Sequence, residues 1–149
     1  MEGLCKWIQC SAGEMPANAV VGGQDGDATL YVGRAAMFGD VIPGKIFPEC
    51  QACFVSWGGD EHQSSEYEAL VGEENAVFEW VETSGGQIPE NAVEGGVTQE
   101  GEKLYIGKAV HENAMTCGKV HPSHGVLYIP YGGLEVPHEN YEILVCKPQ

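Results

Sequence analysis

The sequence predicts an all-β fold in which two tandem repeats pack about a pseudo-twofold axis as a β-sandwich-like single domain. Three observations support this: a long internal repeat, 21 glycines placed between short segments rich in β-branched and aromatic residues, and almost no helical periodicity. The chain has 149 residues, 43% of them hydrophobic, which suffices for one core shared by both repeats. Two separate cores of about 75 residues would each be marginal.

The internal repeat covers nearly the whole chain. Residues of the first half recur 73 positions later up to Gly23, and 74 positions later beyond one inserted residue. The repeated pairs include Trp7/Trp80, Leu30/Leu104, Tyr31/Tyr105, Lys45/Lys119, Glu61/Glu135 and Tyr67/Tyr141. We therefore expect repeat one at residues 7–72 and repeat two at 78–146, within one domain of residues 1–149.

Several segments have the composition of β-strands. They are 28–34, 51–57, 67–71, 77–81, 103–110, 126–131 and 141–146. In the segment 67–71, Tyr67, Ala69 and Val71 would face one side of a sheet. This alternation is typical of half-buried antiparallel sheets.

Glycine-containing pairs mark the turns expected between these strands. Asp25-Gly26 and Glu100-Gly101 supply the positive-φ residue of a tight hairpin. Pro43-Gly44 suits the two central positions of a type II turn, so we expect a turn there as well. Gly58-Gly59 and Gly132-Gly133 predict two further bends.

The charge of the chain excludes several classes of partner. Seven basic residues against 22 acidic ones give a formal net charge of −15, which repels phosphate backbones and anionic lipid surfaces. We expect no nucleic acid partner. No apolar run approaches the roughly 18 residues of a membrane span, so we also expect no membrane insertion. The first residues lack the basic start and apolar stretch of a secretory signal, which favours a cytoplasmic protein or one released by unconventional secretion.

The six cysteines are most compatible with free thiols, because none recurs at the repeat offsets. Cys50 and Cys53 have C-x-x-C spacing, but no second pair completes a zinc site. Cys117, His121 and His124 form a better metal candidate, although their counterparts in repeat one offer only a single metal ligand. We expect no metal or other cofactor. No catalytic motif stands out, so we expect the chain not to be an enzyme.

Basic residues are scarce, which draws attention to those that recur. Lys45 and Lys119 occupy the same place in both repeats, as do Arg34 and Lys108. Each could form a structural salt bridge or contribute to a binding site. Asp25, which is expected in a hairpin turn, could likewise have a structural role or contribute to a binding site.

These residues belong to a pattern that resembles the tandem DM-nine (DM9) repeat family, also found in natterin-like proteins. The pattern comprises a Trp-containing start, Met/Ile-Pro-x-Asn-Ala-Val, Leu-Tyr-Val/Ile-Gly-Arg/Lys-Ala, Pro/Cys-Gly-Lys, and Gly-Gly-x-Glu followed by Tyr-Glu-x-Leu-Val. It runs twice between Trp7 and Val145. The resemblance implies a calcium-independent, mannose-binding lectin that acts in innate immune or microbial recognition.

The resemblance also implies sugar-binding residues. The acidic residue that contacts the sugar corresponds to Asp25, and the lysine corresponds to Lys45. In repeat two the lysine corresponds to Lys119, and the acidic position falls on Thr98 or Glu100. Candidates for the rim of the site are Asp40 and Arg34. We expect weak binding of mannose or mannose-containing glycans, on the order of millimolar, with avidity from a homodimer.

Two alternatives stay open at the level of sequence. Consecutive hairpins would place Asp25 and Lys45 at opposite ends of a strand, so either the segment 38–43 folds back or Asp25 meets Lys119 across the pseudo-twofold. The alternative function is an intracellular adaptor or vesicle-associated stress-response protein that uses the same fold for protein partners.

Overall fold

The computed structural model describes residues 3–149 as an all-β molecule, which confirms the predicted fold class. The strands are β1 Cys5–Ser11, β2 Val21–Asp25, β3 Ala28–Met37, β4 Asp40–Phe47, β5 Ala52–Trp57, β6 Asp60–Ser64, β7 Glu66–Gly72, β8 Ala76–Ser84, β9 Glu94–Val97, β10 Lys103–His111, β11 Ala114–His121, β12 Val126–Tyr131, β13 Leu134–His138 and β14 Asn140–Pro148. Two short 3₁₀ segments, η1 Pro48–Cys50 and η2 Pro122–His124, follow β4 and β11. No helix in the described residues has the length and apolar character needed to span a membrane.

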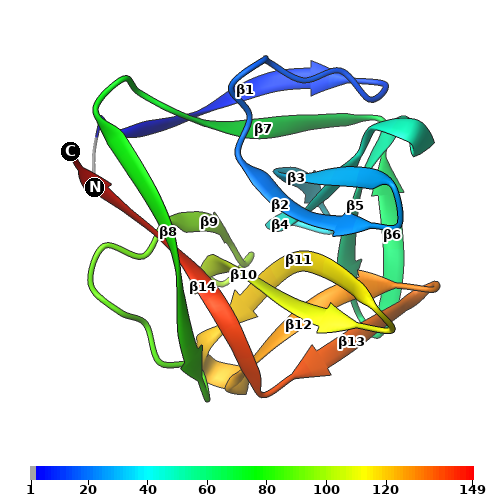
Figure 1. Cartoon of the computed structure of the whole chain (residues 1–149). Helices are drawn as coiled ribbons and strands as arrows, with labels where there is room; N and C mark the ends of the chain where they lie inside the picture. Colours follow the sequence, from blue (N-terminus) through cyan, green and yellow to red (C-terminus); the bar gives the residue numbers. More distant parts are fainter. Residues whose placement is uncertain (1–2) are drawn as a thin grey trace.

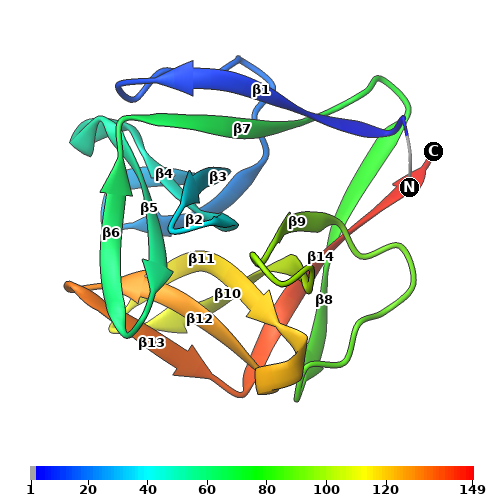
Figure 2. The ribbon, with the colours of Figure 1, turned by 180° about the vertical axis from the view of Figure 1, so that it is seen from behind.

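The strand order reflects the duplicated sequence. One end of the sheet reads β1-β7-β3-β2 and the other end reads β8-β14-β10-β9, while β6 and β13 pair in the middle. Each strand of repeat one thus has a counterpart in repeat two at the corresponding place (Figures 1 and 2). This is the pseudo-twofold relation predicted from the tandem repeat.

The two repeats exchange strand pairings. β2 of repeat one pairs with β11 of repeat two, and β9 of repeat two pairs with β4 of repeat one. Because β3 also pairs with β4 and β10 with β11, the sheet closes on itself, and the packed sheets expected from the sequence are parts of one continuous sheet. A surface hollow where the repeats meet is therefore built by both repeats.

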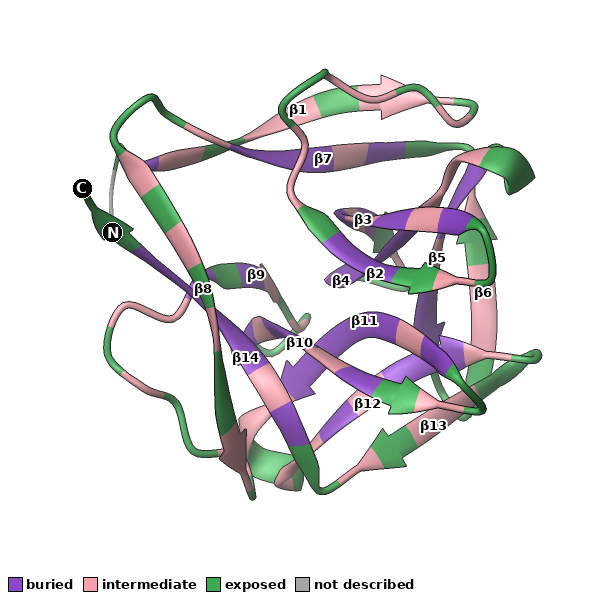
Figure 3. Ribbon diagram, in the orientation of Figure 1, coloured by how far each residue is buried: buried purple, intermediate pink, exposed green. Residues whose placement is uncertain are grey.

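The core consists of one apolar cluster shared by the repeats and one cluster belonging to each. Buried residues of the shared cluster include the repeat-related pairs Val32/Ile106 and Leu70/Leu144. The repeat-one cluster centres on β4, β5 and β7, and the repeat-two cluster on β11, β12 and β14. Figure 3 shows the same arrangement, with buried segments along the central strands and exposed residues at the hairpin ends.

The predicted strand segments all overlap observed strands, and the glycines at positions 26, 58, 59, 101, 132 and 133 have the positive φ expected of turns. The turn predicted at Pro43-Gly44 is wrong. Both residues lie inside β4, where Gly44 pairs with Gly33. A Cβ on Gly44 would overlap the carbonyl oxygen of Phe54, so this glycine permits the close approach of β4 and β5. The actual turn after β3 is formed by Phe38 and Gly39, both with positive φ.

Candidate functional site

A hollow of about 310 Å³ lies at the junction of the two repeats and contains two of the predicted site residues. We call it hollow one. Its lining residues are Asp25, Lys45, Phe47, Cys50, Phe54, Glu61, Tyr131 and Gly132. Tyr131 and Gly132 come from the end of β12 in repeat two, whereas the other residues belong to repeat one.

The hairpin between β3 and β4 explains how Asp25 and Lys45 reach the same hollow. Asp25 ends β2 opposite Ala28, at the beginning of β3. β4 runs back along β3, so that Lys45 pairs with Val32, four residues after Ala28. The chain thus folds back, which is the first of the two arrangements left open by the sequence.

The side chain of Lys45 is almost fully buried, and three contacts fix the position of its ammonium group. Its Nζ donates a hydrogen bond to the carbonyl oxygen of Pro130 at 2.7 Å and lies 4.0 Å from Glu61 Oε2. The ammonium also lies 5.2 Å from the centroid of the Tyr131 ring, within the range of a cation–π contact. Burial lowers the pKa of Lys45, and the nearby carboxylates of Glu61 and Asp25 oppose this shift.

Glu61 joins the two repeats beside hollow one. Its Oε1 accepts a hydrogen bond from the backbone N–H of Gly133 at 2.9 Å, and its own N–H donates to the Gly133 carbonyl at 2.9 Å. Glu135 makes the same pair of bonds with Gly59, each at 2.9 Å. Neither glutamate stands out as a site residue from the sequence alone, although their recurrence in both repeats is a signal for such a role.

A second hollow, of about 380 Å³, lies at the pseudo-twofold-related position. We call it hollow two. Its lining residues are Phe38, Asp40, Trp57, Thr98, Gln99, Glu100, Glu102, His121, Ser123 and His124. Trp57 takes the place of Tyr131, while His121 and His124 replace Phe47 and Cys50. The two hollows are therefore built on equivalent backbone positions of the two repeats but have different side chains.

Lys119, the counterpart of Lys45, does not line hollow two and is more fully paired than Lys45. Lys119 Nζ donates to the carbonyl oxygen of Ser56 at 2.8 Å and lies 3.0 Å from Glu135 Oε2. Burial would raise the pKa of Glu135, but the Gly59 N–H and the Lys119 ammonium lower it overall. Lys119 thus has fewer open hydrogen-bonding directions than Lys45.

Thr98 and Glu100, the candidates for the acidic position of repeat two, line hollow two, and so does Asp40 of repeat one, which was expected at the rim of the Asp25 site. The backbone N–H of Thr98 donates to the carbonyl of Glu102 at 2.8 Å, which extends the pairing of β9 with β10 by one residue. Thr98 therefore occupies in repeat two the position that Asp25 occupies at the end of β2. Glu100 lies in the turn beyond it. Asp40 is buried, and its Oδ1 accepts a hydrogen bond from Gln99 N at 2.9 Å.

Arg34, expected at the rim of the site, lines neither hollow. Its Nε lies 2.7 Å from Glu68 Oε1, and its guanidinium lies 4.2 Å from the ring centroid of Trp7. The reason is the register of β3, which places Arg34 opposite Glu68 of β7 on another part of the sheet. Its counterpart Lys108 lies 4.4 Å from the ring centroid of Trp80.

The cysteine and histidine pattern noted in the sequence does not converge on one point. The Cys117 thiol donates to the carbonyl of Gly44 at 3.4 Å inside the core, and burial raises its pKa to about 12. His121 Nε2 instead lies 2.9 Å from Glu102 Oε1, and its ring stacks on that of His124 with centroids 3.7 Å apart. Among residues 3–149, no group of three or more His, Cys, Asp or Glu side chains is placed to hold a metal ion.

Cys50 and Cys53, which have C-x-x-C spacing, also lie apart, one at the surface and one in the core. Cys50 is exposed in η1, whereas Cys53 is buried in β5. Burial raises the pKa of the Cys53 thiol. The two sulfurs therefore lie in different environments.

Comparisons with known proteins identify relatives of this chain. Natterin-4 of Thalassophryne nattereri is 32% identical over 146 residues, which are 93% of this chain and 33% of that protein. Natterin-3 of the same organism is 37% identical over 96 residues, or 64% of this chain and 24% of that protein. The chain thus spans a third or less of the length of these curated relatives.

A solved structure shares the fold. The crystal structure of the nematode sperm cell motility protein MFP2B matches 98% of this chain and 47% of that chain, with a TM-score of 0.73 and 16% sequence identity.

The family model of the DM9 repeat matches residues 24–138 of this chain, a range that includes Lys45 and Lys119. The protein therefore belongs to the DM9 repeat family.

Proposed function

We propose that hollow one binds a neutral hexose of the mannose type without calcium, and that the chain is a carbohydrate-binding protein and not an enzyme. The observation that carries this proposal is that a carboxylate, Asp25, and a buried ammonium, Lys45, line the same hollow. The family resemblance assigns sugar binding to these same two positions.

The chemistry of a hexose fits this arrangement. Adjacent sugar hydroxyls can donate protons to a carboxylate and accept a hydrogen bond from an ammonium, and such charge-assisted bonds are stronger than neutral ones. Lys45 gives one N–H to Pro130, while Glu61 at 4.0 Å lies beyond hydrogen-bonding distance, so donors remain for a ligand. The rings of Phe54 and Tyr131 add apolar surface on which the C–H face of a sugar can lie.

Such a site binds weakly by itself. Water competes for every sugar hydroxyl, so we expect a Kd on the order of millimolar for a single mannose, or about −4 kcal/mol. Useful retention on a glycan surface then requires several copies of the site, as a homodimer would supply. We accordingly propose recognition of dense mannose-type glycans, such as those of microbial surfaces, as the role of the protein.

Two pairs of variants test the site. Asp25→Asn removes the carboxylate charge, and Asp27→Asn makes the same change two residues away on the exposed turn. Lys45→Met removes the ammonium of hollow one, and Lys119→Met removes its counterpart. Titration of each variant with mannose, followed by NMR or calorimetry, measures the effect, and circular dichroism checks that each variant is folded.

We expect Asp25→Asn to weaken mannose binding at least about tenfold, because a hydrogen bond to a charged group contributes about 1.5–3 kcal/mol. Asp27→Asn should bind as the wild type does. Equal binding by Asp25→Asn and wild type would exclude this site. Capture of protein partners by a chain that binds no glycan on an array would favour the adaptor function instead.

A further inference from the structure

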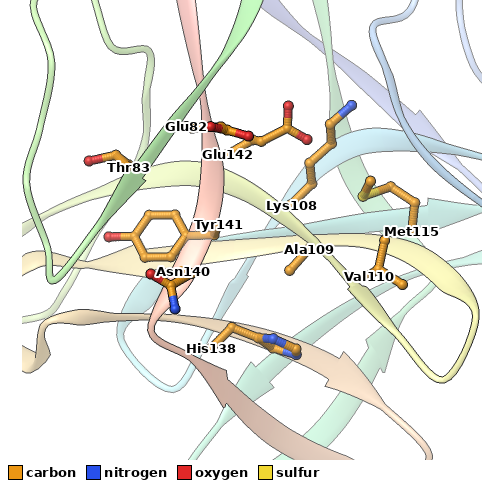
Figure 4. Close-up of a pocket in the computed structure, with 10 residues that line it drawn as sticks. All are labelled: Glu82, Thr83, Lys108, Ala109, Val110, Met115, His138, Asn140, Tyr141 and Glu142. Carbon is orange, nitrogen blue, oxygen red and sulfur yellow. The ribbon is translucent and has the colours of Figure 1, made fainter.

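A third and larger hollow lies on the neighbouring face of repeat two, formed by β8, β10, β11, β13 and β14. We call it hollow three; its volume is about 430 Å³. In Figure 4, Glu142 lies above Tyr141, Lys108 lies to its right and His138 lies below it. Met115 and Val110 add an apolar wall.

Hollow three contains polar groups with hydrogen-bonding capacity left for a ligand. Among the described residues Lys108 forms no ion pair, whereas its counterpart Arg34 is paired with Glu68 at 2.7 Å. His138 Nε2 is buried without a hydrogen-bond partner in the structure. The Tyr141 hydroxyl accepts a bond from Gly86 N at 3.0 Å, which leaves its proton free to donate. Since buried polar atoms are usually hydrogen-bonded, the unpartnered His138 Nε2 suits a ligand with hydroxyls, and the Lys108 ammonium and the Tyr141 proton add further donors.

A row of aromatic rings connects hollow three with hollow one. The ring of His138 in hollow three lies 5.3 Å from that of His111, which in turn lies 5.0 Å from the Tyr131 ring of hollow one. The backbones also meet there, because Met115 of hollow three pairs with Gln24, the residue before Asp25. A ligand that fills hollow one can therefore extend along His111 toward His138.

We propose that hollows one and three together form an extended site for a neutral oligosaccharide of more than one sugar ring, an inference that rests on the proposed function of hollow one. Carboxylates outnumber ammonium groups in both hollows: Asp25 and Glu61 face Lys45, and Glu82 and Glu142 face Lys108. Anionic glycans are excluded by this charge. The site thus takes the terminal sugar in hollow one and the following sugars over His111 and in hollow three.

The test compares mannose with a linear mannotriose as ligands of the full chain. Lys108→Met and His138→Phe remove polar groups from hollow three alone and leave hollow one intact. His62→Phe is the matched control, because the His62 ring lies 4.8 Å from the Phe38 ring of hollow two, away from hollows one and three. Calorimetry gives the affinity and the stoichiometry of both sugars for each variant.

We expect the wild type to bind mannotriose at least about fivefold more tightly than mannose, the gain of one additional net hydrogen bond. Lys108→Met and His138→Phe should each reduce this gain while leaving mannose binding unchanged, and His62→Phe should preserve it. Equal affinity of the wild type for both sugars, or a gain that survives both variants, would overturn the extended site. If neither sugar binds, the function proposed for hollow one also fails.

Discussion

Replacing Glu135 by glutamine should destabilise the protein much more than the same replacement at Glu61. Glu135 Oε2 lies 3.0 Å from Lys119 Nζ, and the two side chains are only 10% and 6% exposed. Glu61 Oε2 lies 4.0 Å from Lys45 Nζ, and the Glu61 side chain is 17% exposed. The pseudo-twofold thus provides two copies of one contact that differ mainly in distance and access to water.

The expected magnitudes follow from these differences. Breaking a buried ion pair by removing one partner costs about 3–5 kcal/mol, because the other charge stays buried. Glutamine at position 135 can still accept from Gly59 N–H, so we expect the lower end, about 3 kcal/mol. At position 61 no hydrogen bond to lysine is lost and Pro130 still binds Lys45, so we expect about 1 kcal/mol.

Urea unfolding at neutral pH, followed by tryptophan fluorescence, measures both losses. In a chain of this size, a loss of about 3 kcal/mol lowers the Tm by about 6–12 °C. Equal losses in the two variants, or a larger loss in Glu61→Gln, would refute the reasoning from distance and burial.

The same contact predicts the response to acid. The pKa of Glu135 in the folded protein lies below its ordinary value. Its contribution to stability is therefore complete above the ordinary carboxyl pKa and disappears as the pH falls through the lower folded value. Glu135→Gln has no carboxyl to protonate here, so its stability should fall less steeply than that of the wild type on acidification. Parallel pH profiles of the two proteins would contradict this expectation.

Three further measurements test other parts of the structure. Because burial lowers the pKa of Lys45, mannose binding should weaken as the pH rises through a value below the ordinary 10.5, which an affinity profile in alkaline buffer detects. Gly44→Ala should cost at least about 2 kcal/mol in urea unfolding, since its Cβ would overlap the Phe54 carbonyl; a smaller loss would contradict the close strand approach. Under native conditions iodoacetamide should alkylate the exposed Cys50 before the buried Cys117, and mass spectrometry of peptides reads the order.

Much of the fold is predictable from the sequence because the repeat is long and turn glycines separate its β-rich segments. Strands β4 and β11 are not among the segments that their composition predicts. In β4 and β11, Gly44 and Gly118 interrupt the apolar pattern because the neighbouring strand passes close to each of them. Local composition cannot distinguish such a glycine from a turn glycine, since the reason for it lies in another strand.

The candidate site was only partly predictable for a similar reason. Asp25 and Lys45 could be named from the family pattern, and the β3–β4 hairpin brings them to one hollow. Tyr131 and Pro130 could not be assigned to this hollow, because they come from repeat two and depend on the pairing between repeats. Periodicity within a strand contains no information about the register between two distant strands.

The pseudo-twofold gives hollows one and two the same scaffold, so their chemical differences arise from a few side chains. In hollow one the carboxylate Asp25 remains beside a lysine that has donors available, whereas in the related position Thr98 replaces the carboxylate and Lys119 is bound by Glu135. Of these two related hollows, hollow one is the one that combines an open acceptor with an open donor. On the proposed function, a chain with one such position per molecule gains avidity only by associating with further copies or by extending contacts along the same glycan.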